Sequence, residues 1–98
     1  MSLRGSQKRY LRGLAHHLQP IVQVGKAGIT EALISATSRA LLDHELIKVR
    51  LPQVDKAERA ALAEVLEQRT SAQLAGLTGR IAILYRRHPD EPTIRLPE

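Results

Sequence analysis

The chain has 98 residues, no cysteine and a formal net charge of +5, with a sequence pI of about 10.2. This length supports one domain with a modest core, and the lack of cysteine excludes disulfides, thiolate metal sites and a cysteine nucleophile. The positive charge favours a polyanionic partner, although charge alone does not distinguish RNA from DNA or from a membrane surface.

The first predicted element is a helix over residues 5–18, which Pro20 ends. Residues 1–19 contain four basic residues and no acid, which favours phosphate contact over an ordinary solvated face, where both signs usually mix. The basic residues are Arg4, Lys8, Arg9 and Arg12. The expected buried stripe consists of Leu11, Leu14, Ala15 and Leu18.

A short apolar run over residues 21–24 predicts a strand, and a tight loop follows at residues 25–28. A second helix is expected to begin near Thr30, which is placed to be its N-cap. Ile29 and Ile34 have the spacing of a hydrophobic staple around that cap. The expected inner face of the helix consists of Leu33, Ala36, Thr37, Ala40 and Leu41.

The loop Gly25-Lys26-Ala27-Gly28 has the chemistry of a phosphate contact. Two glycines let the backbone approach a phosphate closely, the N–H groups at the following helix start favour anions, and Lys26 adds a positive charge. A GXXG loop clamps the nucleotide backbone in KH modules. The alternative is an ordinary tight turn, because many turns use two glycines. A Walker A loop is excluded, because its G-x-x-x-x-G-K-[ST] pattern is absent.

Residues 44–51 alternate in the manner of a strand, with Ile47, Val49 and Leu51 on one face and Leu46, Lys48 and Arg50 on the other. Lys48 and Arg50 are candidates to extend a positive surface, together with Arg80, Arg86 and Arg87 near the last two strands. The alternative is ordinary edge-strand charge, which discourages aggregation.

A third helix is expected to start after Asp55, whose spacing to Glu58 resembles a capping box, and to end near Thr70. Residues 52–71 carry a net negative charge, so this helix is expected to face away from a polyanion. Its expected inner face consists of Ala57, Ala61, Leu62, Val65 and Leu66. Residues 72–77 and 80–85 predict a hairpin around Thr78-Gly79, and residues 88–98 an extended surface tail.

The element order αβαβαββ predicts an α/β (α+β) domain, with a four-stranded mixed sheet packed with three helices. One domain is expected over residues 1–98, with its core over about residues 4–87. Tyr10 and Tyr85 are the only Phe, Tyr or Trp residues, which disfavours the RRM and OB-fold modes of base stacking. We expect Tyr85 to lie at the core edge.

No pattern of nucleophile, general base or metal ligands is present, so we expect no catalysis, no cofactor, no metal and no small-molecule substrate. No apolar run approaches the roughly 20 residues of a membrane span, and no signal-peptide core follows the basic N-terminus. The sequence therefore predicts a cytoplasmic protein, expected to be a monomer.

Taken in order, these motifs resemble the YhbY-type CRM domain, the chloroplast RNA splicing and ribosome maturation module. The resemblance covers about residues 4–95. It rests on LRGLAHHLQPIVQVGKAGITEALI at 11–34, LLDHELIKVRL at 41–51, the capped helix from Asp55, and GRIAILYRR at 79–87. The chain departs from the family at Thr70-Ser71, where a glycine is expected, and at the small Ala82.

The resemblance implies a fold similar to the C-terminal domain of bacterial translation initiation factor three. It also implies RNA binding through the GxxG loop with neighbouring basic residues, and association with precursors of the large ribosomal subunit. The alternatives are a protein-interaction adaptor on ribosomal particles and a DNA-binding protein, although no helix-turn-helix is evident. The residues expected to contact RNA are Gly25, Lys26, Ala27, Gly28, Arg4, Lys8, Arg9, Arg12, Lys48, Arg50, Arg80 and Arg86.

Overall fold

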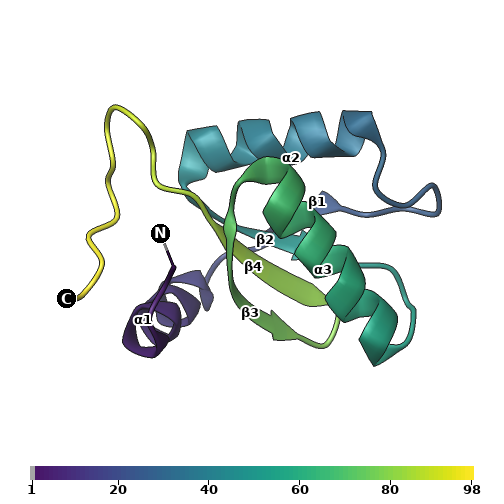
Figure 1. Cartoon of the computed structure of the whole chain (residues 1–98), viewed down its shortest axis with the longest axis horizontal. Helices are drawn as coiled ribbons and strands as arrows, with labels where there is room; N and C mark the ends of the chain where they lie inside the picture. The colour runs from purple at the N-terminus through teal and green to yellow at the C-terminus, as the bar shows by residue number, and fades with distance from the viewer. Residues whose placement is uncertain (1) are drawn as a thin grey trace.

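The computed structural model describes residues 2–98, which form three helices and four strands in the order αβαβαββ (Figure 1). The predicted fold class is therefore confirmed. The elements are α1 (Gly5–Ala15), β1 (Pro20–Gln23), α2 (Glu31–His44), β2 (Leu46–Arg50), α3 (Lys56–Thr70), β3 (Gln73–Thr78) and β4 (Ile81–Tyr85).

The four strands form one mixed sheet in the order β1-β2-β4-β3. β1 runs parallel to β2, and the connection between them is α2, as a parallel pair requires. β4 lies between β2 and β3 and is antiparallel to both. Each predicted strand exists, although the boundaries differ from the sequence prediction by one or two residues.

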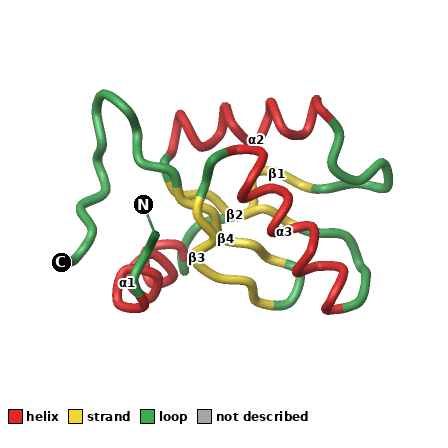
Figure 2. Tube along the Cα trace, in the orientation of Figure 1, coloured by secondary structure: helices red, strands yellow, loops and turns green. Residues whose placement is uncertain are grey.

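Helices cover both faces of the sheet, but unequally (Figure 2). α2 and α3 pack on one face and form the larger core with residues that include Leu41, Leu66 and Val49. α1 packs on the other face, where a second core contains Leu3, Leu11, Ala15, Leu46, Ala75, Ile83 and Tyr85. Because α1 is short and alone, part of that second face stays uncovered.

α1 ends at Ala15, three residues before the predicted end. Leu11 and Ala15 are buried against the sheet, whereas Leu14 and Leu18, also predicted to be buried, are 40% and 38% exposed. The prediction was wrong at Leu18 because the chain turns within residues 16–19 to enter β1, and at Leu14 because α1 contacts the sheet along the stripe of Leu11 and Ala15.

α2 continues to His44, so the strand predicted over residues 44–51 begins only at Leu46. Glu45 joins the two elements with a φ of 63°, which reverses the chain direction between helix and strand. Leu46 points to the same face as Lys48, as predicted, but it is buried because α1 covers that end of the sheet.

Both predicted helix caps are confirmed. Thr30 Oγ1 accepts a hydrogen bond from the Leu33 N–H at 3.1 Å, and Asp55 Oδ1 accepts one from the Glu58 N–H at 2.8 Å. Such caps satisfy N–H groups that have no partner within the helix.

The inner face of α3 differs from the prediction. Ala57, Ala61 and Val65 are exposed, and in α2 Ala36 is exposed as well. The side of α3 that packs on the sheet consists of Leu62, Ala63, Leu66 and Thr70. Thr70 is accommodated there because its hydroxyl donates to the Leu66 carbonyl at 2.6 Å.

The tail after β4 returns toward α1, and in Figure 1 its yellow trace descends beside the N-terminal helix. Ile94 and Leu96 pack against the second core. Near the end, the Pro97 carbonyl accepts a hydrogen bond from Gln7 Nε2 at 3.0 Å. The tail therefore packs against the N-terminal part of the domain.

Candidate nucleic-acid interface

The acidic residues are confined to certain elements of this fold. The ten acidic residues of the chain lie in α2, α3, the turns next to these helices and the tail. α1, the four strands and the loop at residues 25–28 contain no acid at all. The sheet face that α1 partly covers is therefore built from elements without negative charge.

The strand register places two rows of side chains on the uncovered part of that face. The first row consists of Gln23, Arg50, Ile81 and Thr78. The second row consists of Lys48, Ile83 and Gly76. Ile21 lies beside Gln23 and Arg50 in a hollow. We call the surface formed by the two rows and Ile21 the open face.

Lys48 and Arg50, two of the predicted contact residues, lie side by side on the open face. Each is half-buried, and each stands opposite an isoleucine of β4, Ile83 and Ile81 respectively. A long basic side chain can rest its methylene groups on such neighbours while its charge stays in water.

Arg12 borders the open face and is fixed to the sheet. Its Nη1 donates to the Ala75 carbonyl at 2.9 Å, at the bulge of β3. Its stem passes over Gly76, where an added Cβ would lie 2.7 Å from Arg12 Cδ. A second hollow is lined by Arg12, His16, Lys48, Thr78, Ile81 and Ile83, so the structure brings Arg12 and Lys48 to one site.

The glycine loop begins where β1 leaves Arg50. The Val24 N–H donates to the Arg50 carbonyl, and the loop then closes through a Gly28 N–H bond to the Gly25 carbonyl at 3.0 Å. Gly28 has a φ of 75°, a conformation that favours glycine. Lys26 and Ala27 are exposed at its tip.

The loop and α1 lie at opposite ends of the long axis of the molecule in Figure 1. These two groups of expected RNA contacts therefore do not meet in one compact site. The open face lies between them, with Arg50 next to the strand that leads into the loop and Lys48 next to Arg12.

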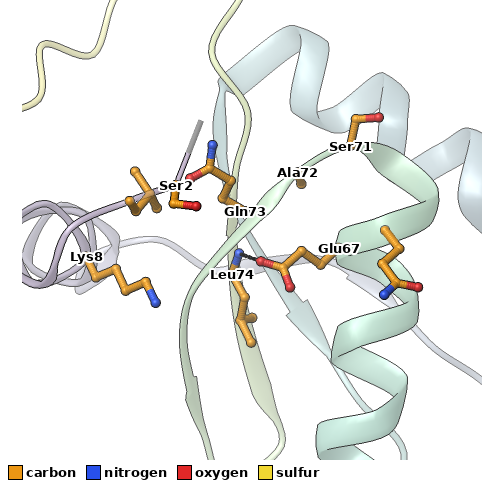
Figure 3. Close-up of a pocket in the computed structure, with 9 residues that line it drawn as sticks. Ser2, Lys8, Glu67, Ser71, Ala72, Gln73 and Leu74 are labelled. Atoms are coloured by element: carbon orange, nitrogen blue, oxygen red, sulfur yellow. Dashed lines mark hydrogen bonds between the residues drawn. The ribbon is translucent and has the colours of Figure 1, made fainter.

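The other basic residues of α1 are differently placed. Lys8 and Arg9 are exposed on the helix surface. Arg4 is the N-cap residue, and its Nη2 donates to the Pro97 carbonyl at 3.4 Å. Lys8 points along the edge of β3, into a hollow of about 460 Å³ that also contains Gln73 and Glu67 (Figure 3).

That hollow contains a buried acceptor without a hydrogen-bond partner among the described residues, the Gln73 side-chain oxygen. Glu67 in the same hollow accepts a hydrogen bond from the Leu74 N–H at 2.7 Å, drawn as a dashed line in Figure 3. Its carboxylate therefore helps to hold the start of β3 against α3.

Arg80 and Arg86, predicted as RNA contacts, form structural hydrogen bonds. Arg80 Nε donates to the Leu51 carbonyl at 3.0 Å and supports the β3–β4 turn. Arg86 donates to the Thr70 carbonyl at 2.9 Å and to the carbonyl and hydroxyl of Ser38. It therefore lies on the side of α2 and α3, away from the open face.

The two tyrosines differ in environment. Tyr10 is 42% exposed on α1. Tyr85 is buried in the second core, as predicted, and its burial together with the nearby Glu45 carboxylate raises its pKa, which Arg87 opposes. Neither ring lies on the open face.

Among residues 2–98, no helix is long and apolar enough to cross a membrane. The same part of the chain contains no cluster of three or more histidine or acidic side chains that could hold a metal ion.

Comparison with known proteins adds a family and several relatives. The sequence profile of the CRS1 / YhbY (CRM) domain matches residues 3–86. The chain is 40% identical to Probable RNA-binding protein YqeI of Bacillus subtilis over 95 residues, which cover 97% of this chain and 99% of that protein. It is 38% identical to an RNA-binding protein of Haemophilus influenzae over 96 residues, covering 98% and 96% of the two chains.

The fold is also similar to a known structure. The solution structure of the hypothetical protein SAV1595 from Staphylococcus aureus, for which RNA binding is suggested, superposes with a TM-score of 0.86. The two chains are 41% identical, and the match covers 97% of this chain and 99% of the other. These relatives are named for RNA binding and not for a reaction.

Proposed function

The chain belongs to the CRS1/YhbY (CRM) domain family, and from this membership we propose that it is a non-catalytic RNA-binding protein. Its RNA-contacting surface consists of the glycine loop, the open face and the basic residues of α1. The relatives named for RNA binding support the ligand class, because the match with them extends over nearly the whole chain.

The observation that carries the proposal is the absence of acidic residues from the loop, the strands and α1. Phosphate contacts dominate the affinity of proteins for nucleic acids, and nearby carboxylates would oppose them. The loop, the strands and α1 supply positive charge without any acid, whereas α3 contains three acidic residues beside its three basic ones. RNA bound to the open face would therefore meet no carboxylate on the strands, the loop or α1.

We further propose, from the family resemblance, that the ligand is ribosomal RNA in precursors of the large subunit. The protein would act as a cytoplasmic monomer during ribosome assembly. It needs no cofactor for this role, since holding RNA in position requires no bond to be made or broken.

The test is RNA affinity as a function of salt, measured with fragments of large-subunit ribosomal RNA. The variants are Lys26→Ala in the loop and Lys8→Ala/Arg9→Ala on α1. Arg12 is left intact, because its bond to Ala75 makes it part of the fold. Lys56→Ala, at the exposed start of α3, is the matched control for loss of a charge elsewhere.

If phosphates dominate, log K falls linearly with log salt, and each lost contact makes the slope shallower by about 0.7–0.9. Lys26→Ala is expected to show this change and Lys56→Ala is not. Wild-type slope and affinity in both the loop and α1 variants would refute the proposed surface.

A protein-interaction adaptor is the second candidate, and one observation favours it. Tyr10, Leu14 and Leu18 are exposed at four-residue steps along α1 and the turn after it. If the protein is such an adaptor, Leu14→Ser should weaken its association with ribosomal particles and leave its affinity for protein-free RNA unchanged. An equal loss of affinity for ribosomal particles and for RNA would show that RNA binding alone explains the association with the particles.

A further inference from the structure

The open face has a composition that suits one form of RNA more than another. Its floor is aliphatic, with Ile21, Ile81 and Ile83. Its charges are Lys48 and Arg50, and its neutral polar groups are Gln23 and Thr78. Among the described residues, the single ring that borders it is His16, which already packs edge-to-face against His17 at 5.1 Å.

A surface of this kind offers few groups on which splayed bases could stack. Single-stranded RNA is recognised mainly by aromatic or guanidinium planes on which unstacked bases lie, with hydrogen bonds to their edges. Both tyrosines lie elsewhere, and the Arg12 guanidinium donates to the Ala75 carbonyl, which leaves the Arg50 guanidinium as the single planar cation of the open face among the described residues. The open face offers charges and amide or hydroxyl groups, which match phosphates and ribose hydroxyls.

We propose that the open face binds the backbone of double-helical RNA, an inference that rests on the proposed function and specifies its ligand class. Double-helical RNA is recognised by shape and by contacts to phosphates and 2′-hydroxyls across its wide minor groove. Lys48 and Arg50 contact phosphates, and Gln23 and Thr78 at the two sides of the first row contact 2′-hydroxyls.

The spacing of the two charges supports this assignment. Lys48 and Arg50 are two residues apart on one strand, so their Cα atoms are separated by about 7 Å. Isoleucines opposite both residues restrict their stems, which keeps the two charges next to each other along the strand. Two adjacent charges held this way can follow consecutive phosphates of one RNA strand.

The open face also connects the two outlying basic elements. Arg50 lies where β1 leads into the glycine loop, and Lys48 shares a hollow with Arg12 of α1. A rigid helix laid along this line can reach the loop at one end of the molecule and α1 at the other. An unpaired strand would need no such straight line of contacts.

The test compares three ligands of one sequence: an RNA hairpin with a long perfect stem, the unpaired RNA strand of that stem, and the DNA duplex. The variant is Lys48→Gln/Arg50→Gln, which keeps polar side chains of moderate length on the strand. The matched control is Arg39→Gln/Lys56→Gln, which removes two exposed charges from α2 and α3. Thermal melting verifies that each variant is folded.

Wild type is expected to bind the RNA hairpin more tightly than the single strand or the DNA duplex. The Lys48→Gln/Arg50→Gln variant should lose about tenfold in hairpin affinity and about 1.8 in salt slope, whereas the control should lose neither. Replacing the 2′-hydroxyls of the stem by hydrogen should weaken wild-type binding, a result that does not depend on any variant.

Two results would overturn the inference and leave the proposed function standing: tighter binding of the single strand, or an unchanged salt slope in the folded Lys48→Gln/Arg50→Gln variant. Failure of wild type to bind any RNA would instead refute the proposed function. The two ideas are therefore tested separately by one set of titrations.

Discussion

Glu45, at the junction of α2 and β2, is a buried carboxylate that holds the tail to the domain. It is 3% exposed, and its side chain accepts hydrogen bonds from the N–H groups of His88, Thr93 and Ile94 and from the Thr93 hydroxyl. Burial by itself raises the pKa of Glu45, but these donors outweigh it and lower the pKa from 4.5 to about 2.

The pH dependence of stability should therefore reflect Glu45. Since its pKa is lower in the folded state, the stabilisation is complete above pH 4.5 and is lost as pH falls through about 2. The shift corresponds to ~3 kcal/mol. We therefore expect Glu45→Gln to lower the free energy of unfolding by about 2–3 kcal/mol at pH 6. The difference in free energy of unfolding between wild type and this variant should shrink toward pH 2.

Urea unfolding at pH 6, 4 and 2.5 measures this, with Glu64→Gln on the exposed side of α3 as the control. Parallel pH profiles for wild type and Glu45→Gln would show that Glu45 does not couple the tail to folding.

Ser71 ends α3 in the left-handed conformation, with φ 56° and ψ 28°. A side chain costs roughly 1–2 kcal/mol there, which glycine avoids. Ser71→Gly is therefore expected to stabilise the protein by about 1 kcal/mol and to raise the melting temperature by roughly 4–8 °C. Ser71→Ala, which keeps the Cβ, should not raise it. Equal melting temperatures for the two variants would argue against this origin.

Gly76 and Arg12 are coupled by close packing. Because an added Cβ at Gly76 would lie 2.7 Å from Arg12 Cδ, Gly76→Ala must displace Arg12 and strain its bond to Ala75. We expect a loss of about 1 kcal/mol in wild type and a smaller loss in an Arg12→Ala background, with a coupling energy of roughly 0.5 kcal/mol or more. Denaturant unfolding of the four proteins measures it, and additive effects would contradict the contact.

At the scale of elements, Arg86 connects the strand that precedes it to the end of α3 and the middle of α2. It donates to the Thr70 carbonyl at the end of α3 and to Ser38 within α2. Arg86→Ala should lower the free energy of unfolding by about 2 kcal/mol, since hydrogen bonds from a charged donor are among the stronger ones. Arg87→Ala, next to it and exposed, should change it by less than roughly 0.5 kcal/mol. Similar effects of the two substitutions would contradict this role.

The sequence predicted the existence and order of all seven elements, because periodicity and caps are local signals. Thr30 and Asp55 mark their helix starts correctly. The predicted buried face was wrong where a helix has two apolar stripes. In α3, Val65 is exposed and Ala63 is buried, although valine is the more apolar residue. Which stripe packs on the sheet depends on tertiary contacts that a single helix does not encode.

The sequence indicated several basic residues of the candidate site, but not how the fold arranges them. Alternation along β2 correctly placed Lys48 and Arg50 on one face. The structural bonds of Arg80 and Arg86 could not be predicted, since their acceptors lie at least 16 residues away in sequence. The separation of the loop from α1 could not be predicted either, because it depends on where the folded sheet places these two elements.

At the scale of the whole molecule, the protein has two unlike sides. α2 and α3 contain half of the acidic residues of the chain and cover the larger core. α1 covers only part of the opposite face and leaves the open face accessible between itself and the glycine loop. The proposed RNA contact extends along the long axis, over elements that contain no acid.

The most direct test is an NMR titration of the ¹⁵N-labelled protein with an unlabelled RNA hairpin. Amide signals are expected to shift at residues 19–28, 48–50 and 78–83 and at the C-terminal end of α1, while those of α3 stay in place. Shifts concentrated on α3 and the outer side of α2, with the open face unaffected, would contradict the account.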